Sequence, residues 1–165
     1  VMNGYLNAPH NAPFILASAS PRRCDLLAQV GLVQNETLPA DIDETPLKSE
    51  RPDIYARRMA IAKAKKIAQQ WPDGFILGAD TVVACGQRIL PKAKTVGELR
   101  ASLNLLSGRQ HRVYGGIALI APNGEITSRL SLSKVAFRRL SHSDVDALIC
   151  QGDGIGKAGG YAIRT

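Results

Sequence analysis

Cysteine and aromatic residues are scarce in this sequence, and each shortage excludes a class of protein. The three cysteines, Cys24, Cys85 and Cys150, are far apart and form no CxxC pair. A disulfide framework and a zinc site are therefore unexpected, and a reducing cytoplasm is the expected setting. Aromatic residues make up 5% of the chain, which is too few for a stacking platform that would bind single-stranded nucleic acid.

Long apolar runs are also missing. No stretch approaches the ~18 apolar residues that span a bilayer, so we expect no membrane partner. Residues 1–11 are polar and lack the apolar core of a signal peptide. We expect residues 1–13 to be a disordered lead or an upstream remnant, and residues 14–165 to form one domain.

The charge of the chain is strongly one-sided, with 21 basic residues against 14 acidic ones and a net charge of +7. A basic balance favours polyanionic partners, which include nucleic acids and small phosphorylated molecules. Charge alone does not distinguish the two. The sequence has no block of five or more basic residues, and this argues against a nucleic-acid-binding domain.

The order of apolar runs and turn formers predicts the secondary structure. Residues 14–17 predict a buried strand, and Ser20 and Pro21 are typical of a helix N-cap and first residue. The helix that they begin, residues 22–30, carries three apolar residues on one face: Leu26, Leu27 and Val30. Further along we expect a polar loop at 35–52, helices at 53–70, 95–106 and 141–152, and strands at 75–84, 88–90, 113–121 and 126–140.

Strands and helices alternate at first, and two strands then follow one another directly. This order predicts an α/β fold with a mixed sheet flanked by helices. The glycine-rich stretch from Gly154 to Tyr161 lacks the spacing of a Walker phosphate loop, and we expect it to be a flexible turn region.

The segment Ser18-Ala19-Ser20-Pro21-Arg22-Arg23 is the first candidate for chemistry. A helix N-terminus presents free N–H groups and a partial positive charge. Two hydroxyls and two guanidinium groups at that point make an anion site suited to phosphate oxygens. The alternative is a capped helix with two solvated arginines, although arginine opposes the helix dipole there.

Asp80 is the second candidate, because it stands in an otherwise apolar stretch. A buried carboxylate is unfavourable unless it is paired, hydrogen-bonded or bound to a metal. Thr81, the next residue, faces the other way by strand alternation. Asp80 is suited to hold a divalent cation or to act as a general base on water. The alternative is a strand-end residue that caps a nearby turn.

Two lysines and an acidic loop complete the candidates. Lys63 lies on the apolar side of its predicted helix, and Lys92 follows the strand after Asp80. Each suits either a phosphate contact or a solvated surface amine. The loop at 35–52 holds three acids that suit either a metal or the solvent: Asp41, Asp43 and Glu44.

Seven stretches match one protein family in order: Leu16 to Arg23 with Leu26 and Leu27, Asp43 to Thr45, Ala62 to Ala64, Gly78 to Val82, Ile89 to Lys92, Leu106 to Gly108 with His111, and Lys157 to Ile163. Together they resemble the Maf (septum-formation inhibitor) family. The resemblance runs from about Phe14 to Ile163, and its first and fourth stretches are the most specific.

The resemblance implies a fold and an activity. Maf proteins have an α/β fold with a central cleft, similar to that of inosine-triphosphate pyrophosphatases. They hydrolyse nucleoside triphosphates between the α and β phosphates, with Mg²⁺ or Mn²⁺, and usually form homodimers. The Asp-Thr pair at 80 and 81 is similar to the branch that acts on dTTP and UTP. Such a reaction needs positive charge, a metal and an oriented water, and the candidate residues suit these needs.

The resemblance also implies roles for single residues. Asp80 matches the proposed proton acceptor, and Asp80 and Glu44 are the expected metal ligands. Arg22 and Thr81 match positions that bear on substrate choice. The other expected substrate-binding residues are Ser18, Arg23, Glu44, Lys63, Lys92 and Arg164.

The chain departs from the family pattern near its end. Arg164 stands where family members usually have Gln, and they continue for a few dozen residues beyond the position of Thr165. We therefore expect a C-terminal part of the family fold to be missing. This expectation leaves a non-catalytic nucleotide-binding or regulatory protein as the alternative function.

Overall fold

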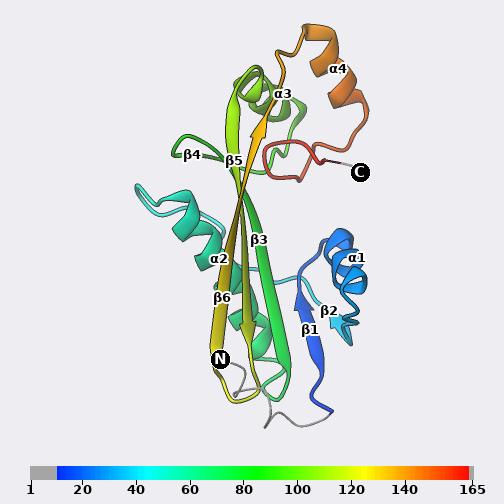
Figure 1. Ribbon diagram of the computed structural model, residues 1–165, viewed down its shortest axis with the longest axis vertical. Coiled ribbons are helices and arrows are strands. Elements are labelled where there is room, and N and C mark those ends of the chain that lie inside the picture. Colours follow the sequence, from blue (N-terminus) through cyan, green and yellow to red (C-terminus); the bar gives the residue numbers. More distant parts are fainter. Residues whose placement is uncertain (1–10, 164–165) are drawn as a thin grey trace. The chain divides into compact units, whose positions relative to one another are not determined.

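A computed structural model of the chain describes residues 11–163 (Figure 1). Its helices are α1 (Pro21–Gln29), α2 (Pro52–Ala68), α3 (Val96–Leu106) and α4 (His142–Cys150). Its strands are β1 (Phe14–Ala17), β2 (Glu36–Thr37), β3 (Phe75–Cys85), β4 (Arg88–Leu90), β5 (Gln110–Ile120) and β6 (Ile126–Ala136).

The strands form one mixed sheet in the order β2-β1-β3-β5-β6, with β4 paired to β3. β1 runs parallel to both of its neighbours, whereas β4 runs antiparallel to β3. The predicted mixed α/β sheet with flanking helices is confirmed. No helix in residues 11–163 is long and apolar enough to cross a membrane.

The chain divides into two compact units. Of the described residues, the first unit holds 11–80 together with Gly116–Leu130, and the second holds Thr81–Gly115 and 131–163. The boundary falls inside β3, between Asp80 and Thr81. The predicted bounds of the lead and the domain stay predictions, and residues 1–10 and 164–165 lie outside the described part.

The core of the first unit forms where α2 packs against β1, β3 and β5. Alanines on α2 meet glycines on the strands. A Cβ added to Gly78 of β3 would collide with the carbonyl oxygen of Ala60 and would lie 2.7 Å from the backbone nitrogen of Ala64. A Cβ on Gly116 of β5 would collide with the Ala56 carbonyl oxygen. The two glycines therefore allow the helix backbone to lie directly on the strands.

The second unit is built on a helix pair, α3 and α4, which contact each other. Each begins with a capping box, in which Thr95 and Glu98 or Ser141 and Asp144 satisfy each other's backbone N–H groups, as predicted. The glycine-rich stretch from Gly154 is made of turns, yet it packs against α3. A Cβ on Gly154 would lie 2.7 Å from a methyl group of Leu99. The expected turns are present, and the expected flexibility stays a prediction.

Three local expectations differ from the structure. The polar loop contains a short strand, β2, which pairs with β1. The sequence has no apolar pattern there from which this strand could have been predicted. The side chain of Ser20 makes no capping hydrogen bond, although α1 begins at Pro21 as expected. The strand predicted to reach residue 140 ends at Ala136.

Candidate active site

The centre of the candidate site is a buried lysine between two carboxylates in the first unit. Lys63 Nζ donates to Asp80 Oδ1 at 2.6 Å and lies 2.7 Å from Glu44 Oε1. The side chains of Lys63 and Asp80 are 8% and 6% exposed, so both charges are largely withdrawn from water. A buried charge is unfavourable unless an opposite charge lies beside it. Here the Lys63 ammonium and the Asp80 carboxylate compensate each other, and Glu44 adds a second negative charge beside the ammonium.

Close packing of α2 on β3 explains why these residues meet. Lys63 follows Ala60 by one helical turn, and Asp80 lies two residues beyond Gly78, on the same face of β3. Because Gly78 lets the helix backbone lie on the strand at Ala60, the Lys63 ammonium comes within 2.6 Å of the Asp80 carboxylate. In the sequence Gly78-Ala79-Asp80, the glycine thus allows the close packing of α2 and the aspartate belongs to the candidate site.

Ser18 and Arg23 stand at the junction of β1 and α1. Ser18 is buried, and its Oγ accepts hydrogen bonds from Arg23 Nη1 at 2.8 Å and from the Ser20 N–H at 3.1 Å. Burial lowers the pKa of Arg23, the negative charge of Asp80 raises it, and Arg22 lowers it. The electrostatic influence of Asp80 and Glu44 on this guanidinium connects the loop at 18–23 with the Lys63 cluster.

The structure brings five of the predicted residues into one unit around this cluster: Ser18, Arg23, Glu44, Lys63 and Asp80. Arg22 belongs to the same unit and is exposed at the start of α1. Thr81 and Lys92 belong to the second unit, where both are exposed and Lys92 forms a β-bridge with Ala158. Arg164 lies outside the described residues.

The donor set fits a divalent cation that is completed by a substrate. Within residues 11–163, no group of three or more His, Cys, Asp and Glu side chains is arranged to hold a metal ion. Glu44 and Asp80 nevertheless converge on one ammonium group. Mg²⁺ is commonly held by one or two carboxylates together with substrate phosphates. Two carboxylates beside Ser18 and Arg23 match that pattern, and oxygen ligands suit Mg²⁺ or Mn²⁺.

Sequence reasoning missed a set of residues that support Glu44 from α2. Tyr55 is buried, and its hydroxyl donates to the Glu44 carbonyl oxygen at 2.6 Å. Burial, and then the negative charges of Asp80 and Glu44, raise the pKa of Tyr55 to about 12, so the hydroxyl keeps its proton. The available signal was the spacing, because Tyr55, Met59 and Lys63 lie four residues apart on one helix face.

Comparison with protein families gives a match over almost the whole described chain. The family of Maf-like proteins matches residues 13–165. The chain is similar to the dTTP/UTP pyrophosphatase of Paramagnetospirillum magneticum, with 55% identity over 153 residues that cover 93% of this chain and 80% of the relative. It is also similar to the dTTP/UTP pyrophosphatase of Caulobacter vibrioides, with 53% identity over 91% of this chain and 78% of the relative.

Comparison with solved structures supports the fold. The chain is similar to the Staphylococcus aureus Ham1 protein, with a TM-score of 0.51 and 14% identity over 73% of this chain and 69% of that one. At this identity the likeness concerns the fold alone, namely a mixed sheet with flanking helices.

Proposed function

The chain belongs to the Maf-like protein family, and from that premise we propose that it is a nucleoside triphosphate pyrophosphatase. The reaction adds water across the bond between the α and β phosphates and yields a nucleoside monophosphate and pyrophosphate. dTTP and UTP are the proposed substrates, because the relatives at 55% and 53% identity carry that activity in their names. The observation that carries the proposal is the buried Lys63 with Asp80 and Glu44.

Asp80 is the proposed catalytic residue. It is 5% exposed, and Lys63 fixes one of its carboxylate oxygens. A carboxylate held in one orientation is suited to accept a proton from the attacking water. Lys63 Nζ also lies 2.7 Å from Glu44 Oε1, so it keeps a second carboxylate partner when Asp80 accepts the proton.

The phosphates need positive charge and hydrogen-bond donors. In the first unit we assign this role to Ser18, Arg22, Arg23 and Lys63. In the second unit we assign it to Lys92. Arg22, Thr81 and Arg164 are the residues proposed to bear on the choice of base.

Asp80 and Glu44 are the residues that would hold Mg²⁺ or Mn²⁺. When bound, the cation supplies Lewis-acid chemistry, which neutralises charge that develops on phosphate oxygens. Lys63 pairs with both carboxylates, so its ammonium group helps to hold these two oxygen ligands close together.

The proposed setting of the enzyme is the cytoplasm, and the proposed assembly is a homodimer. The described cysteines, Cys24, Cys85 and Cys150, are all free thiols, which agrees with a reducing compartment. Sedimentation of the purified chain tests the assembly directly, and a monomer at every concentration would contradict it.

The test of the function is a panel of canonical and modified nucleoside triphosphates, with products identified by anion-exchange chromatography. We expect monophosphate and pyrophosphate from dTTP and UTP with Mg²⁺. We expect Asp80→Asn to lower kcat by about 10²–10⁴-fold, the range for loss of a general base. Asp73→Asn, at an exposed position just before β3, is the matched control and should keep full activity. If the products are a nucleoside diphosphate and inorganic phosphate, the enzyme does not cleave between the α and β phosphates. An active Asp80→Asn enzyme would refute the assignment of Asp80 as the catalytic residue.

A further inference from the structure

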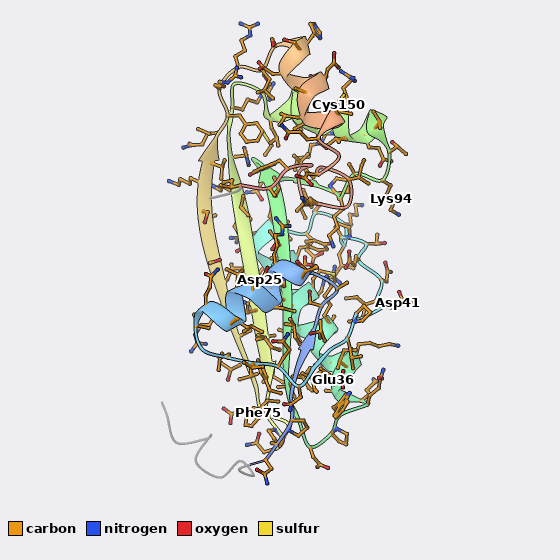
Figure 2. All side chains as sticks on the ribbon, turned by 90° about the vertical axis from the view of Figure 1, so that its right-hand side faces the viewer. Asp25, Glu36, Asp41, Phe75, Lys94 and Cys150 are labelled. Carbon is orange, nitrogen blue, oxygen red and sulfur yellow. The ribbon has the colours of Figure 1, made fainter. Side chains whose placement is uncertain are left out.

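Glu44 lies in a segment without helix or strand, between β2 and α2. Figure 2 labels Glu36 and Asp41, which mark the path of the chain from β2 into this segment. A side chain in such a loop is ordinarily mobile, because few contacts fix its backbone. The Glu44 carboxylate nevertheless reaches Lys63 at 2.7 Å. Something in the first unit must therefore hold the loop, and the contacts of residues 43–50 show what it is.

The first contact is an ion pair between the loop and α2. Arg58 Nε donates to Glu50 Oε1 at 2.6 Å, and Arg58 Nη2 donates to Glu50 Oε2 at 2.7 Å. The side chain of Glu50 is only 4% exposed. A two-point pair of this kind fixes orientation as well as distance. Arg58 lowers the pKa of Glu50 through these hydrogen bonds, so the pair stays ionised at neutral pH.

The same two side chains also hold the loop backbone. Glu50 Oε2 accepts the N–H of Leu47 at 2.9 Å, and Arg58 Nη2 donates to the Thr45 carbonyl oxygen at 3.2 Å. The turn that they close contains Ser49 with φ of 57°, a left-handed conformation that is unfavourable for a serine. The ion pair thus stabilises a turn that the loop would not adopt easily by itself.

The second contact acts on Glu44 itself. Tyr55 donates its hydroxyl to the Glu44 carbonyl oxygen at 2.6 Å. The guanidinium of Arg58 lies 5.5 Å from the centre of the Tyr55 ring, within the range of a cation–π interaction. Tyr55 and Arg58, in the first two turns of α2, therefore bind the loop at Glu44, Thr45 and Glu50.

We propose that Tyr55, Arg58 and Glu50 form a positioning clamp, which holds the acidic loop so that the Glu44 carboxylate stays at Lys63 and Asp80 and is available to a divalent cation. The three are positioning residues, because they act through Glu44 and touch no reacting atom. The inference rests on the proposed function for its catalytic consequence, but the geometry of the clamp is independent of the substrate.

The experiment compares Arg58→Gln with Arg57→Gln in the full chain. Arg57 is the adjacent residue on the same helix and is exposed, so its substitution removes the same charge without removing the clamp. Hydrogen exchange is measured by mass spectrometry on peptides that cover residues 41–51 and, as an internal reference, β3. Loss of charge-assisted hydrogen bonds should raise exchange of the loop about tenfold in Arg58→Gln. Arg57→Gln and the β3 peptides should be unchanged.

The second readout is the affinity for Mn²⁺ alone, followed by electron paramagnetic resonance of the free ion. We expect Arg58→Gln to weaken binding by about tenfold, as loss of an outer support of a metal ligand does. In turnover, a high Mg²⁺ concentration should restore kcat in this variant, which a merely unfolded fraction would not allow. The Mn²⁺ affinity of Arg58→Lys should fall between that of the wild type and that of Arg58→Gln, because lysine keeps the charge but loses the paired donors.

Tyr55→Phe is the milder variant, since it keeps the ring and removes only the hydroxyl. It should loosen the loop less than Arg58→Gln and should shift Mn²⁺ affinity in the same direction. Equal behaviour of Arg58→Gln and Arg57→Gln would overturn the clamp, and so would a loosened loop with unchanged Mn²⁺ affinity. A wild-type chain that releases no pyrophosphate would overturn the proposed function, and the exchange and Mn²⁺ arms would still decide the clamp.

Discussion

In the first unit a charged side chain, Lys63, is buried between Asp80 and Glu44, whereas in the second unit a neutral one, His111, is buried among aromatic rings. His111 is 2% exposed, and its Nε2 lies 2.6 Å from the hydroxyl of Tyr161. The rings of Phe137 and Tyr161 meet it edge-on at 5.2 and 5.5 Å. Burial lowers the pKa of His111 and raises that of Tyr161 to about 12, so both stay uncharged at neutral pH.

The two buried clusters differ in whether their polar groups are ionised or neutral. Groups that stay neutral when buried need only one good hydrogen bond and close neighbours. Ionised groups in the interior require each other, and removal of one partner leaves the other exposed to the full desolvation penalty. In the first unit such ions lie close to the loop at 18–23, which carries further cationic and hydroxyl groups, and a combination of this kind is a candidate for a reaction site. The buried polar groups around His111 in the second unit are neutral and contact each other, an arrangement that is typical of packing.

The strongest test of the contrast removes the ammonium. Lys63→Met should destabilise the fold by about 3–5 kcal/mol, because Asp80 is left buried without its partner, and should abolish turnover. Urea unfolding at pH 7 measures the change. The double variant Lys63→Met with Asp80→Asn removes the orphaned charge as well and should recover part of the loss. If the double variant is no more stable than the single one, the unpaired charge is not the cause.

The next test attacks the packing that aligns the ion pair. Gly78→Ala places a methyl group against the Ala60 carbonyl oxygen, and we expect a loss of about 1–3 kcal/mol, the range for an overpacked core. Displacement of α2 should also separate Lys63 from Asp80 and lower activity more than stability alone explains. Thermal unfolding and pyrophosphate release on the same samples measure the two effects.

Gly97→Ala in α3 is the control for that substitution. Apart from its chain neighbours and the backbone of its own helix, the nearest atom to the new Cβ is Thr95 Oγ1 at 3.9 Å, so there is room for the methyl group. Alanine restricts the unfolded chain and should stabilise the second unit by up to about 1 kcal/mol. Equal losses at both glycines would show that the close approach at Gly78 is not the reason for its sensitivity.

Local patterns predicted most of the fold. The capping boxes at Thr95 and Ser141 depend on neighbours three residues away, and both are present as expected. β2 was missed because it consists of two residues that pair through backbone atoms alone. The apolar face predicted for α1 is present in the sequence but is not in a core. Leu26 and Val30 are 59% and 70% exposed, and none of the nine residues of α1 is buried.

The candidate site was predictable where the composition was anomalous. Asp80 in an apolar strand and Lys63 on an apolar helix face each required a partner, and the structure makes them partners. The clamp on Glu44 was not predictable, because nothing in the sequence distinguishes Glu50 and Arg58 from charged residues at the surface. Their meaning depends on how the loop folds back onto α2, a tertiary contact that no local spacing specifies.

The third test uses pH to distinguish the two clusters. The folded pKa of His111 lies below the ordinary value of 6.5, so the unfolded chain takes up a proton first as the pH falls. The contribution of His111 to stability is complete above about pH 6.5 and is lost progressively below it, by up to about 1.4 kcal/mol per pH unit. Urea unfolding at pH 7.5 and pH 5.5 should show this loss in the wild type and less of it in His111→Gln. Equal losses would assign the pH dependence to other groups.

The smallest expected effect sharpens the claim that the second cluster is structural. Tyr161→Phe removes the hydroxyl that contacts His111 Nε2 and keeps the ring against Phe137, whose centroid lies 4.8 Å away. Loss of one buried neutral hydrogen bond should lower stability by about 1 kcal/mol. Because both residues are neutral and the ring remains, kcat and KM should stay at wild-type values under conditions where the variant is fully folded. A fall in kcat without a matching fall in stability would place Tyr161 in the chemistry, and the separation of a charged reactive cluster from a neutral packing cluster would then fail.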